Sequence, residues 1–195
     1  RASDEGLDLK QVRVSVAGKY FQALLAYIIA DTASENGYRI LLDPDLRKYD
    51  ELQGTVVMLG DTALKPDADL VLYKPDDVMT PIAIFSCKTS LRERIHQSVM
   101  WKLLAELSFM KCEYSSTVEG CPVDKYKMDV EIDRDIILGF ITMDWYNELA
   151  NPQYKGISSI FDVIYTSNLN INLPNVRSID LIFDDIRNDW TGIKT

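Results

Sequence analysis

Histidine, cysteine and long hydrophobic runs are all scarce in this sequence. Its 195 residues include one histidine and three cysteines (Cys87, Cys112 and Cys121), and no two cysteines form a Cys-x-x-Cys pair. A structural zinc site takes four such ligands, so the composition argues against one. Thiols without a disulfide pattern are typical of a reducing cytoplasm. No apolar run approaches the roughly 20 residues of a membrane helix, so we expect no membrane association.

Basic residues are also in the minority. Lys and Arg number 21 against 30 Asp and Glu, which gives a net charge of −9 and a pI near 4.6. Nucleic-acid binding usually leaves a basic footprint, so this balance favours a non-catalytic module whose acidic surface docks a protein. It does not exclude a local DNA cleft. Carboxylates that hold Mg²⁺ add negative charge themselves, and much of the acid lies in residues 124–135 and 180–189, away from Arg92.

The length predicts one domain over residues 1–195, and hydrophobic periodicity predicts that helices alternate with strands in it. We expect residues 1–11 to be frayed, and the start at Arg1 without a methionine leaves open a preceding N-terminal domain. The expected fold class is α/β (α+β), with a mixed central β-sheet flanked by helices. Helices are predicted over 12–33, 90–110, 144–151 and 176–188, strands over 38–42, 55–59, 69–73, 82–88 and 136–143, and a loop over 113–129.

Residues 64–106 carry the chemistry. The turn at 74–77 predicts an antiparallel hairpin between the strands 69–73 and 82–88, which places Asp69 beside Lys88. Alternate residues of a strand share a face, so Asp67 points the same way as Asp69, and Ser86 the same way as Lys88. Such a carboxylate and ammonium can bind a hard cation and a phosphate together. A surface ion pair of little energetic value is the simpler interpretation.

The predicted helix over 90–110 favours a functional site over a simple surface ion pair. Helical spacing places Arg92 on one stripe with Val99, Leu103, Glu106 and Met110, and we expect this stripe to face the protein. Charged residues in such a place need partners or a task. Arginine suits the edge of guanine and an acid can accept from cytosine, so Arg92, Glu93 and Arg94, with Gln97 after them, are candidate base readers.

These residues resemble a known pattern. Pro66-Asp67, an apolar strand and Lys88 resemble the PD-(D/E)XK nuclease superfamily. The run from Ser86 to Arg94 resembles type II restriction endonucleases of the group that cuts CCGG or CCWGG sites, EcoRII-like and BsaWI-like. The resemblance implies a restriction-endonuclease-like fold and a homodimer in the cytoplasm of a prokaryotic cell. It further implies Mg²⁺-dependent cleavage of double-stranded DNA at a short, palindromic, G/C-containing site.

The same resemblance assigns roles. Lys88 would be the catalytic lysine, Asp69 a catalytic metal ligand, and Arg92, Glu93, Arg94 and Gln97 the DNA-binding residues. Two departures leave the second carboxylate open. Ser86 stands where the family pattern has an acid, and Trp101 and Lys102 stand where an acid on the helix is expected. Glu106, as a further catalytic and metal-binding acid, and Asp67, as a metal ligand, are the alternatives.

Other features favour plainer roles. Trp101 and Trp145 are expected to be packing residues, and His96 a helix-surface residue. Asn168, Asn170 and Asn172 favour a turn-rich loop, with contact to adenine as the alternative. A PD-(D/E)XK nuclease of repair or mobile-element processing, with little sequence preference, remains a second enzymatic hypothesis.

Overall fold

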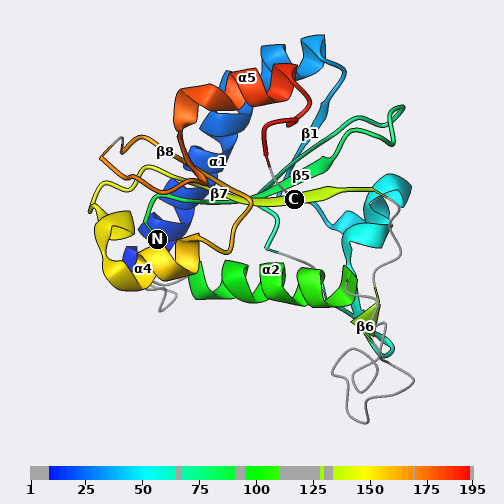
Figure 1. Cartoon of the computed structure of the whole chain (residues 1–195), viewed down its shortest axis with the longest axis horizontal. Coiled ribbons are helices and arrows are strands. Elements are labelled where there is room, and N and C mark those ends of the chain that lie inside the picture. The colour runs from blue at the N-terminus through cyan, green and yellow to red at the C-terminus, as the bar shows by residue number, and fades with distance from the viewer. Residues whose placement is uncertain are drawn as a thin grey trace.

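A mixed six-stranded sheet forms the centre of the molecule (Figure 1). The structure is a computed structural model, and it describes residues 9–64, 67–90, 95–109, 128–129, 134–168 and 170–193. The strand order is β1-β4-β5-β7-β8-β9. Strand β4 runs antiparallel to both of its neighbours, β1 and β5, whereas β5, β7, β8 and β9 are parallel. The strands are β1 (Arg39–Leu42), β4 (Leu70–Tyr73), β5 (Ile82–Lys88), β7 (Ile136–Thr142), β8 (Val163–Thr166) and β9 (Val176–Ser178).

Helices cover both faces of this sheet, as the sequence predicts (Figure 1). The helices α1 (Leu9–Glu35) and α5 (Ile182–Arg187) pack on one face, and α2 (Ile95–Phe109) and α4 (Pro152–Ser158) on the other. Along β5, Ala83, Phe85 and Cys87 enter the core under α1, whereas Ile84 packs on the side of α2. This alternation is the two-residue period of a strand that is buried on both faces. It assigns Ser86 and Lys88 to the face of α2.

A smaller sheet and several short turns complete the described chain. The small sheet has the order β3-β2-β6 and consists of β2 (Val57–Leu59), β3 (Thr62–Leu64) and β6 (Met128–Asp129). Short 3-10 helices occupy Leu46–Lys48, Asp50–Thr55, Glu148–Ala150 and Ile179–Leu181. The predicted loop over 113–129 lies outside the described residues except at β6. No helix among the described ranges is long and apolar enough to cross a membrane.

Two element predictions are wrong, and each has a physical reason. Residues 144–151 form no α-helix but only the short 3-10 helix Glu148–Ala150, and Asn151-Pro152 begins α4 instead of ending a helix. The Asn151 side chain accepts a hydrogen bond from the Gln153 N–H at 2.9 Å, and proline suits the first helical position. The predicted helix over 176–188 begins with β9, which pairs in parallel with β8. Here an available sheet edge overrides the local helical pattern.

Candidate active site

The β4–β5 hairpin brings Asp69 to Lys88, as the sequence predicts. Leu70 pairs with Phe85, and the Asp69 N–H donates to the Phe85 carbonyl at 3.0 Å. Lys88 Nζ then lies 2.5 Å from Asp69 Oδ2. Both side chains are almost fully buried, so this is not the solvated surface pair of the simpler interpretation.

Asp67 joins this pair from the same side. Its Oδ2 lies 3.3 Å from Lys88 Nζ. The Ser86 hydroxyl lies 3.3 Å from Asp67 Oδ2 and 3.4 Å from Asp69 Oδ2. The four side chains therefore converge at the carboxyl end of β5, and the predicted sharing of faces is confirmed.

Three hydrogen bonds to the backbone of other residues hold Asp69. Its N–H donates to the Phe85 carbonyl, as described above, and its own carbonyl accepts from the Asp43 N–H at 2.9 Å. Its carboxylate Oδ2 accepts from the Cys87 N–H at 2.7 Å. Burial raises the pKa of the Asp69 carboxyl despite the opposing effects of Lys88 and the Cys87 N–H. Burial therefore disfavours the charged form, and a further cation at this carboxylate would offset that cost.

The donor set fits a hard divalent cation. The described donors to Asp67 and Asp69 all reach Oδ2, so Oδ1 of each carboxylate has no donor from the described part of the chain. Magnesium binds through one or two carboxylates, several waters and substrate oxygens. Within the described ranges no three His, Cys, Asp or Glu side chains gather as a metal cluster.

Glu106 lies in a different cluster. It pairs with Lys102 at 3.2 Å, and Lys102 also lies 2.6 Å from Asp162. Asp162 Oδ2 accepts from the Leu138 N–H, and Leu138 is in register with Ile84. Since Ile84 precedes Lys88 by four residues, this cluster lies about 13 Å along the sheet from Lys88. The geometry favours Asp67 over Glu106 as the second carboxylate.

The predicted inward stripe of α2 is wrong for two of its members. Leu103 is exposed, and the Glu106 side chain is 51% exposed. The buried face of α2 instead consists of Ile95, Ser98, Val99, Lys102 and Ala105. Its three- and four-residue steps follow the same helical period, so the error is a rotation of the helix, which only tertiary packing fixes.

The candidate base readers lie partly outside the described residues. Arg92, Glu93 and Arg94 fall in 91–94, and nothing is described for them. Gln97 and His96 are exposed on the first turn of α2, which begins seven residues after Lys88. In the sequence the candidate base readers therefore lie between the carboxyl end of β5 and the first turn of α2.

A loop that the sequence does not predict lies beside the lysine. Thr142 of β7 is in register with Lys88, and the chain then turns at Asp144, which has a positive φ of 47°. Asp144 Oδ1 accepts from the Glu148 N–H at 2.6 Å. The Glu148 carboxylate in turn accepts from the Ser90 hydroxyl at 3.1 Å, two residues beyond Lys88.

This loop holds two aromatic side chains in solvent. Trp145 is 69% and Tyr146 65% exposed, so the prediction that Trp145 packs in the core is wrong. The loop itself is firmly held, because Asn168 Nδ2 donates both to Asp144 Oδ2 at 3.0 Å and to Asn147 Oδ1 at 2.9 Å. The sequence signal for this exposed loop was a pair of aromatic residues just after an apolar strand. Apolarity alone does not say whether such residues pack inside or remain exposed.

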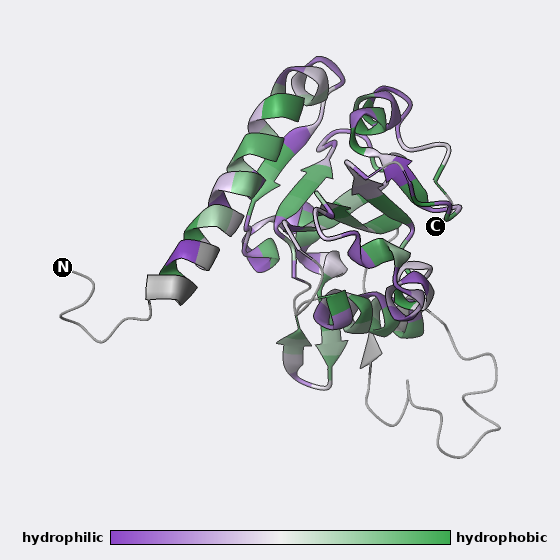
Figure 2. Cartoon of the chain, turned by 90° about the vertical axis from the view of Figure 1, so that its left-hand side faces the viewer, coloured by the Kyte–Doolittle hydropathy of each residue, from purple (hydrophilic) through white to green (hydrophobic). Residues whose placement is uncertain are grey.

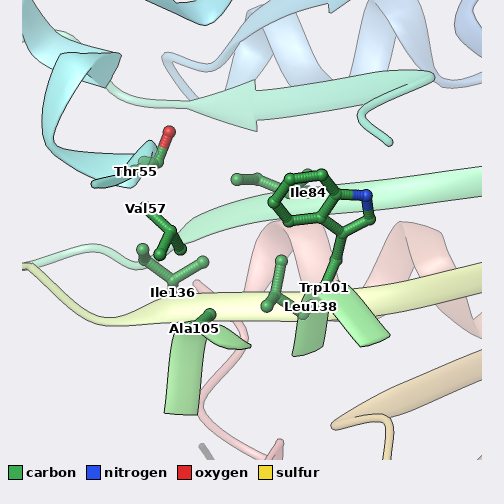
Figure 3. A pocket seen from close by; sticks show the side chains of 7 residues that line it. All are labelled: Thr55, Val57, Ile84, Trp101, Ala105, Ile136 and Leu138. Atoms are coloured by element: carbon green, nitrogen blue, oxygen red, sulfur yellow. The ribbon is translucent and has the colours of Figure 1, made fainter. Parts of the chain in front are cut away.

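Trp101, in contrast, is a packing residue as expected. It lines a small apolar pocket under α2, formed also by Thr55, Val57, Ile84, Ala105, Ile136 and Leu138 (Figure 3). Carbon atoms dominate this lining, so the pocket does not suit a phosphate.

Comparisons with known proteins place these residues in a class of DNA-binding nucleases. The family model described as BsaWI restriction endonuclease type 2 matches residues 45–186, a range that includes Asp67, Asp69 and Lys88. The chain therefore belongs to the BsaWI family of type II restriction endonucleases, enzymes that hydrolyse DNA.

One solved structure is similar over most of the chain. It is described as the crystal structure of a pre-specific complex of the restriction endonuclease BsaWI with DNA. Identity is 14%, the similarity covers 96% of this chain and 70% of that one, and the TM-score is 0.48. No curated protein matches the chain.

Proposed function

We propose that this enzyme cleaves double-stranded DNA at a short, palindromic, G/C-containing site and that cleavage depends on Mg²⁺. The observation that carries the proposal is the convergence of Asp67, Asp69 and Lys88 at the end of β5. Family membership gives the reaction class, and this cluster supplies the groups that phosphodiester hydrolysis requires.

In the proposed mechanism Asp69 and Asp67 would hold the metal through their carboxylate oxygens. When bound, Mg²⁺ supplies positive charge for the phosphate and for an attacking water. Lys88 already lies within contact distance of both carboxylates, so a third ammonium hydrogen can donate to the water or to a phosphate oxygen. The fixed backbone of Asp69 keeps this geometry before substrate arrives, which lowers the reorganisation that the reaction needs.

Base reading is assigned to the residues that follow the lysine. Arg92, Glu93 and Arg94 come four to six residues after Lys88 in the sequence, and Gln97 is exposed on the next turn. Arginine can donate two hydrogen bonds to guanine, and glutamate can accept one from cytosine. Recognition and hydrolysis would thus be linked through one short segment.

The exposed loop at 145–146 is a second proposed DNA contact. Trp145 and Tyr146 project from a loop whose base is bonded to Ser90, so they lie at the same edge of the sheet as Lys88. Aromatic rings pack against bases and sugars without needing positive charge. This suits a protein whose net charge is −9.

A homodimer is proposed because a palindromic site has two-fold symmetry, and two copies place one catalytic cluster at each strand. A restriction enzyme acts on DNA within the cell, so the proposed function also implies action in the cytoplasm of a prokaryote.

The testing experiment is digestion of a mixed-sequence plasmid with Mg²⁺, followed by sequencing of the fragment ends. We expect discrete fragments that share one palindromic sequence at their ends, and no cleavage by Lys88→Ala. Random ends would support the less specific nuclease instead. Intact plasmid, or equal cleavage by Lys88→Ala, would reject the proposal.

A second variant separates reading from hydrolysis. Arg94→Ala is expected to relax or abolish site preference, since an arginine–guanine contact contributes about 1–3 kcal/mol of discrimination. A uniform loss of affinity across sequences would make Arg94 a phosphate contact rather than a base reader.

A further inference from the structure

An apolar stripe runs along the outer side of α1. Its large side chains are exposed although the same helix buries Leu25, Ala26, Ile29 and Ala33 in the core. Tyr20 is 73% and Tyr27 81% exposed. The stripe consists of Val12, Val16, Tyr20, Leu24, Tyr27 and Ile28, mostly at four-residue spacing. Exposed apolar surface of this extent and regularity marks an interaction site.

The amino-terminal half of α1 also extends away from the rest of the described chain (Figure 2). Residues Val12, Arg13, Val16 and Tyr20 are all exposed, whereas the buried positions of the helix begin at Leu25. A helix of 27 residues is about 40 Å long. Isolated helical turns are marginal in water and gain their stability from packing, so this half of α1 needs a partner surface.

The stripe is complementary to itself. If two copies of α1 pair antiparallel about a two-fold axis at position 22, Val16 lies opposite Ile28 and Tyr20 lies opposite Leu24. Tyr27 then lies opposite the exposed Ala17. Apolar residues thus meet apolar ones, and the large Tyr27 ring meets a small side chain.

In the same antiparallel register, charged residues near the two ends of the stripe also lie opposite residues of the opposite charge. Arg13 lies opposite Asp31 in this arrangement, and both side chains are exposed. Each two-fold pair therefore forms two Arg–Asp contacts, whereas a parallel pairing sets Arg13 against Arg13. A closed two-fold contact requires such a self-complementary patch.

We infer that the exposed stripe of α1 is the dimer interface, and that the partner is a second copy of this chain packed antiparallel on it. The inference deepens the homodimer of the proposed function by naming the surface that forms it. The stripe precedes residues 45–186, so it lies outside the matched part of the family.

The test measures molar mass by light scattering and sedimentation on the full chain without DNA. Wild type should have twice the 22.2 kDa chain mass, and Leu24→Glu should dissociate with at least a tenfold larger dissociation constant. Met79→Glu is the matched control, since Met79 is an exposed apolar residue in the turn before β5 and should leave the dimer intact. Helical circular dichroism checks that each variant is folded.

A charge exchange makes the register testable. Arg13→Asp and Asp31→Arg should each weaken the dimer a few-fold, and the double exchange should restore it. A monomeric wild type, a dimeric Leu24→Glu protein, or a double exchange without recovery would overturn the inference. The mass measurement does not depend on catalysis. A dimer through α1 that cuts no DNA would refute the proposed function alone, and a site-specific nuclease whose Leu24→Glu form stays dimeric would refute the interface alone.

Discussion

Two lysine–aspartate pairs lie on the same face of the central sheet and are almost identical in local geometry. Lys88 lies 2.5 Å from Asp69, and Lys102 lies 2.6 Å from Asp162. In each pair the carboxylate also accepts a backbone N–H at 2.7 Å, and burial raises the pKa of the aspartate. Each lysine has a second acid beside it, Asp67 at 3.3 Å and Glu106 at 3.2 Å.

What differs is where the pairs lie. Asp69 lies just before β4 and Lys88 ends the adjacent strand β5, at the same edge of the sheet as the exposed loop at 145–146. Lys102 sits in the middle of α2 and binds the segment between α4 and β8, so its pair fastens a helix to the sheet. A short, buried lysine–aspartate pair therefore does not by itself identify a catalytic lysine. The proposed catalytic role of Lys88 therefore rests on the position of its pair at the ends of two strands, beside an exposed loop.

The strongest test of this comparison replaces each lysine by methionine. Lys88→Met should slow DNA cleavage by at least about 100- to 1000-fold, because a positioned donor near the reacting phosphate is lost. Lys102→Met should cleave within a few-fold of wild type per folded molecule at a temperature well below unfolding. Single-turnover cleavage with matched amounts of folded protein measures both, and equal losses would end the distinction between the two pairs.

For stability we expect the larger effect at Lys102. Lys102→Met leaves the buried Asp162 carboxylate without its main partner and beside Glu106, so the free energy of unfolding should fall by about 3–5 kcal/mol. Urea unfolding at neutral pH measures this loss. Lys102→Met combined with Asp162→Leu should recover most of it, and no recovery would mean that the lysine stabilises the fold in some other way.

Magnesium should discriminate the two pairs as well. At a concentration 100-fold above its dissociation constant, Mg²⁺ should stabilise wild type by about 2.7 kcal/mol. Asp69→Asn and Asp67→Asn should lose this stabilisation, whereas Asp162→Asn and Glu106→Gln should keep it. Thermal unfolding with and without Mg²⁺ decides this. Loss of the stabilisation in Glu106→Gln would return Glu106 to the site as the second carboxylate.

The exposed aromatic loop should have a smaller effect. Trp145→Ala should weaken DNA binding about 5- to 100-fold, the range for loss of one aromatic stacking contact, while Trp145→Phe keeps most of the affinity. Gel-shift titration in the Lys88→Ala background measures this without cleavage, and Met79→Ala is the control for loss of an exposed apolar side chain. Unaltered affinity in Trp145→Ala would remove the loop from the DNA surface.

The smallest expected effect is a pH dependence of stability at Asp162. Its folded pKa is raised from 3.8 by burial, so the protonated form is favoured in the folded state. The stabilisation that this group contributes is full below pH of about 3.8 and is lost as pH rises through the raised folded pKa. Relative to Asp162→Asn, wild type should therefore lose stability across that window. An unchanged difference in urea midpoint across the window would show that Lys102 cancels the effect of burial.

Local patterns predicted the parts of the molecule that depend on neighbours in the chain. The bounds of β5 are correct, as is the hairpin that places Asp69 beside Lys88, because a short turn and a two-residue period leave few alternatives. The same reasoning failed at 144–151 and 176–178. In the first case the buried Asp144 turns the chain and accepts a hydrogen bond from Asn168, 24 residues further on. In the second case the free edge of β8 accepts β9 as a neighbouring strand. Neither partner can be read from the local pattern of the segment itself.

The sequence by itself determined the hairpin with its aspartate and lysine, the following Arg-Glu-Arg segment and the alternation of helices with strands. These depend on spacing, which the chain carries locally. Only the tertiary structure decided that Lys102 faces Asp162, that Glu106 pairs with Lys102, and that Trp145 and the stripe of α1 are exposed. Each of these features depends on how a helix is rotated, or how a turn is anchored, against residues that are distant in sequence. The inner and outer sides of a helix become different only when the rest of the protein packs against one of them.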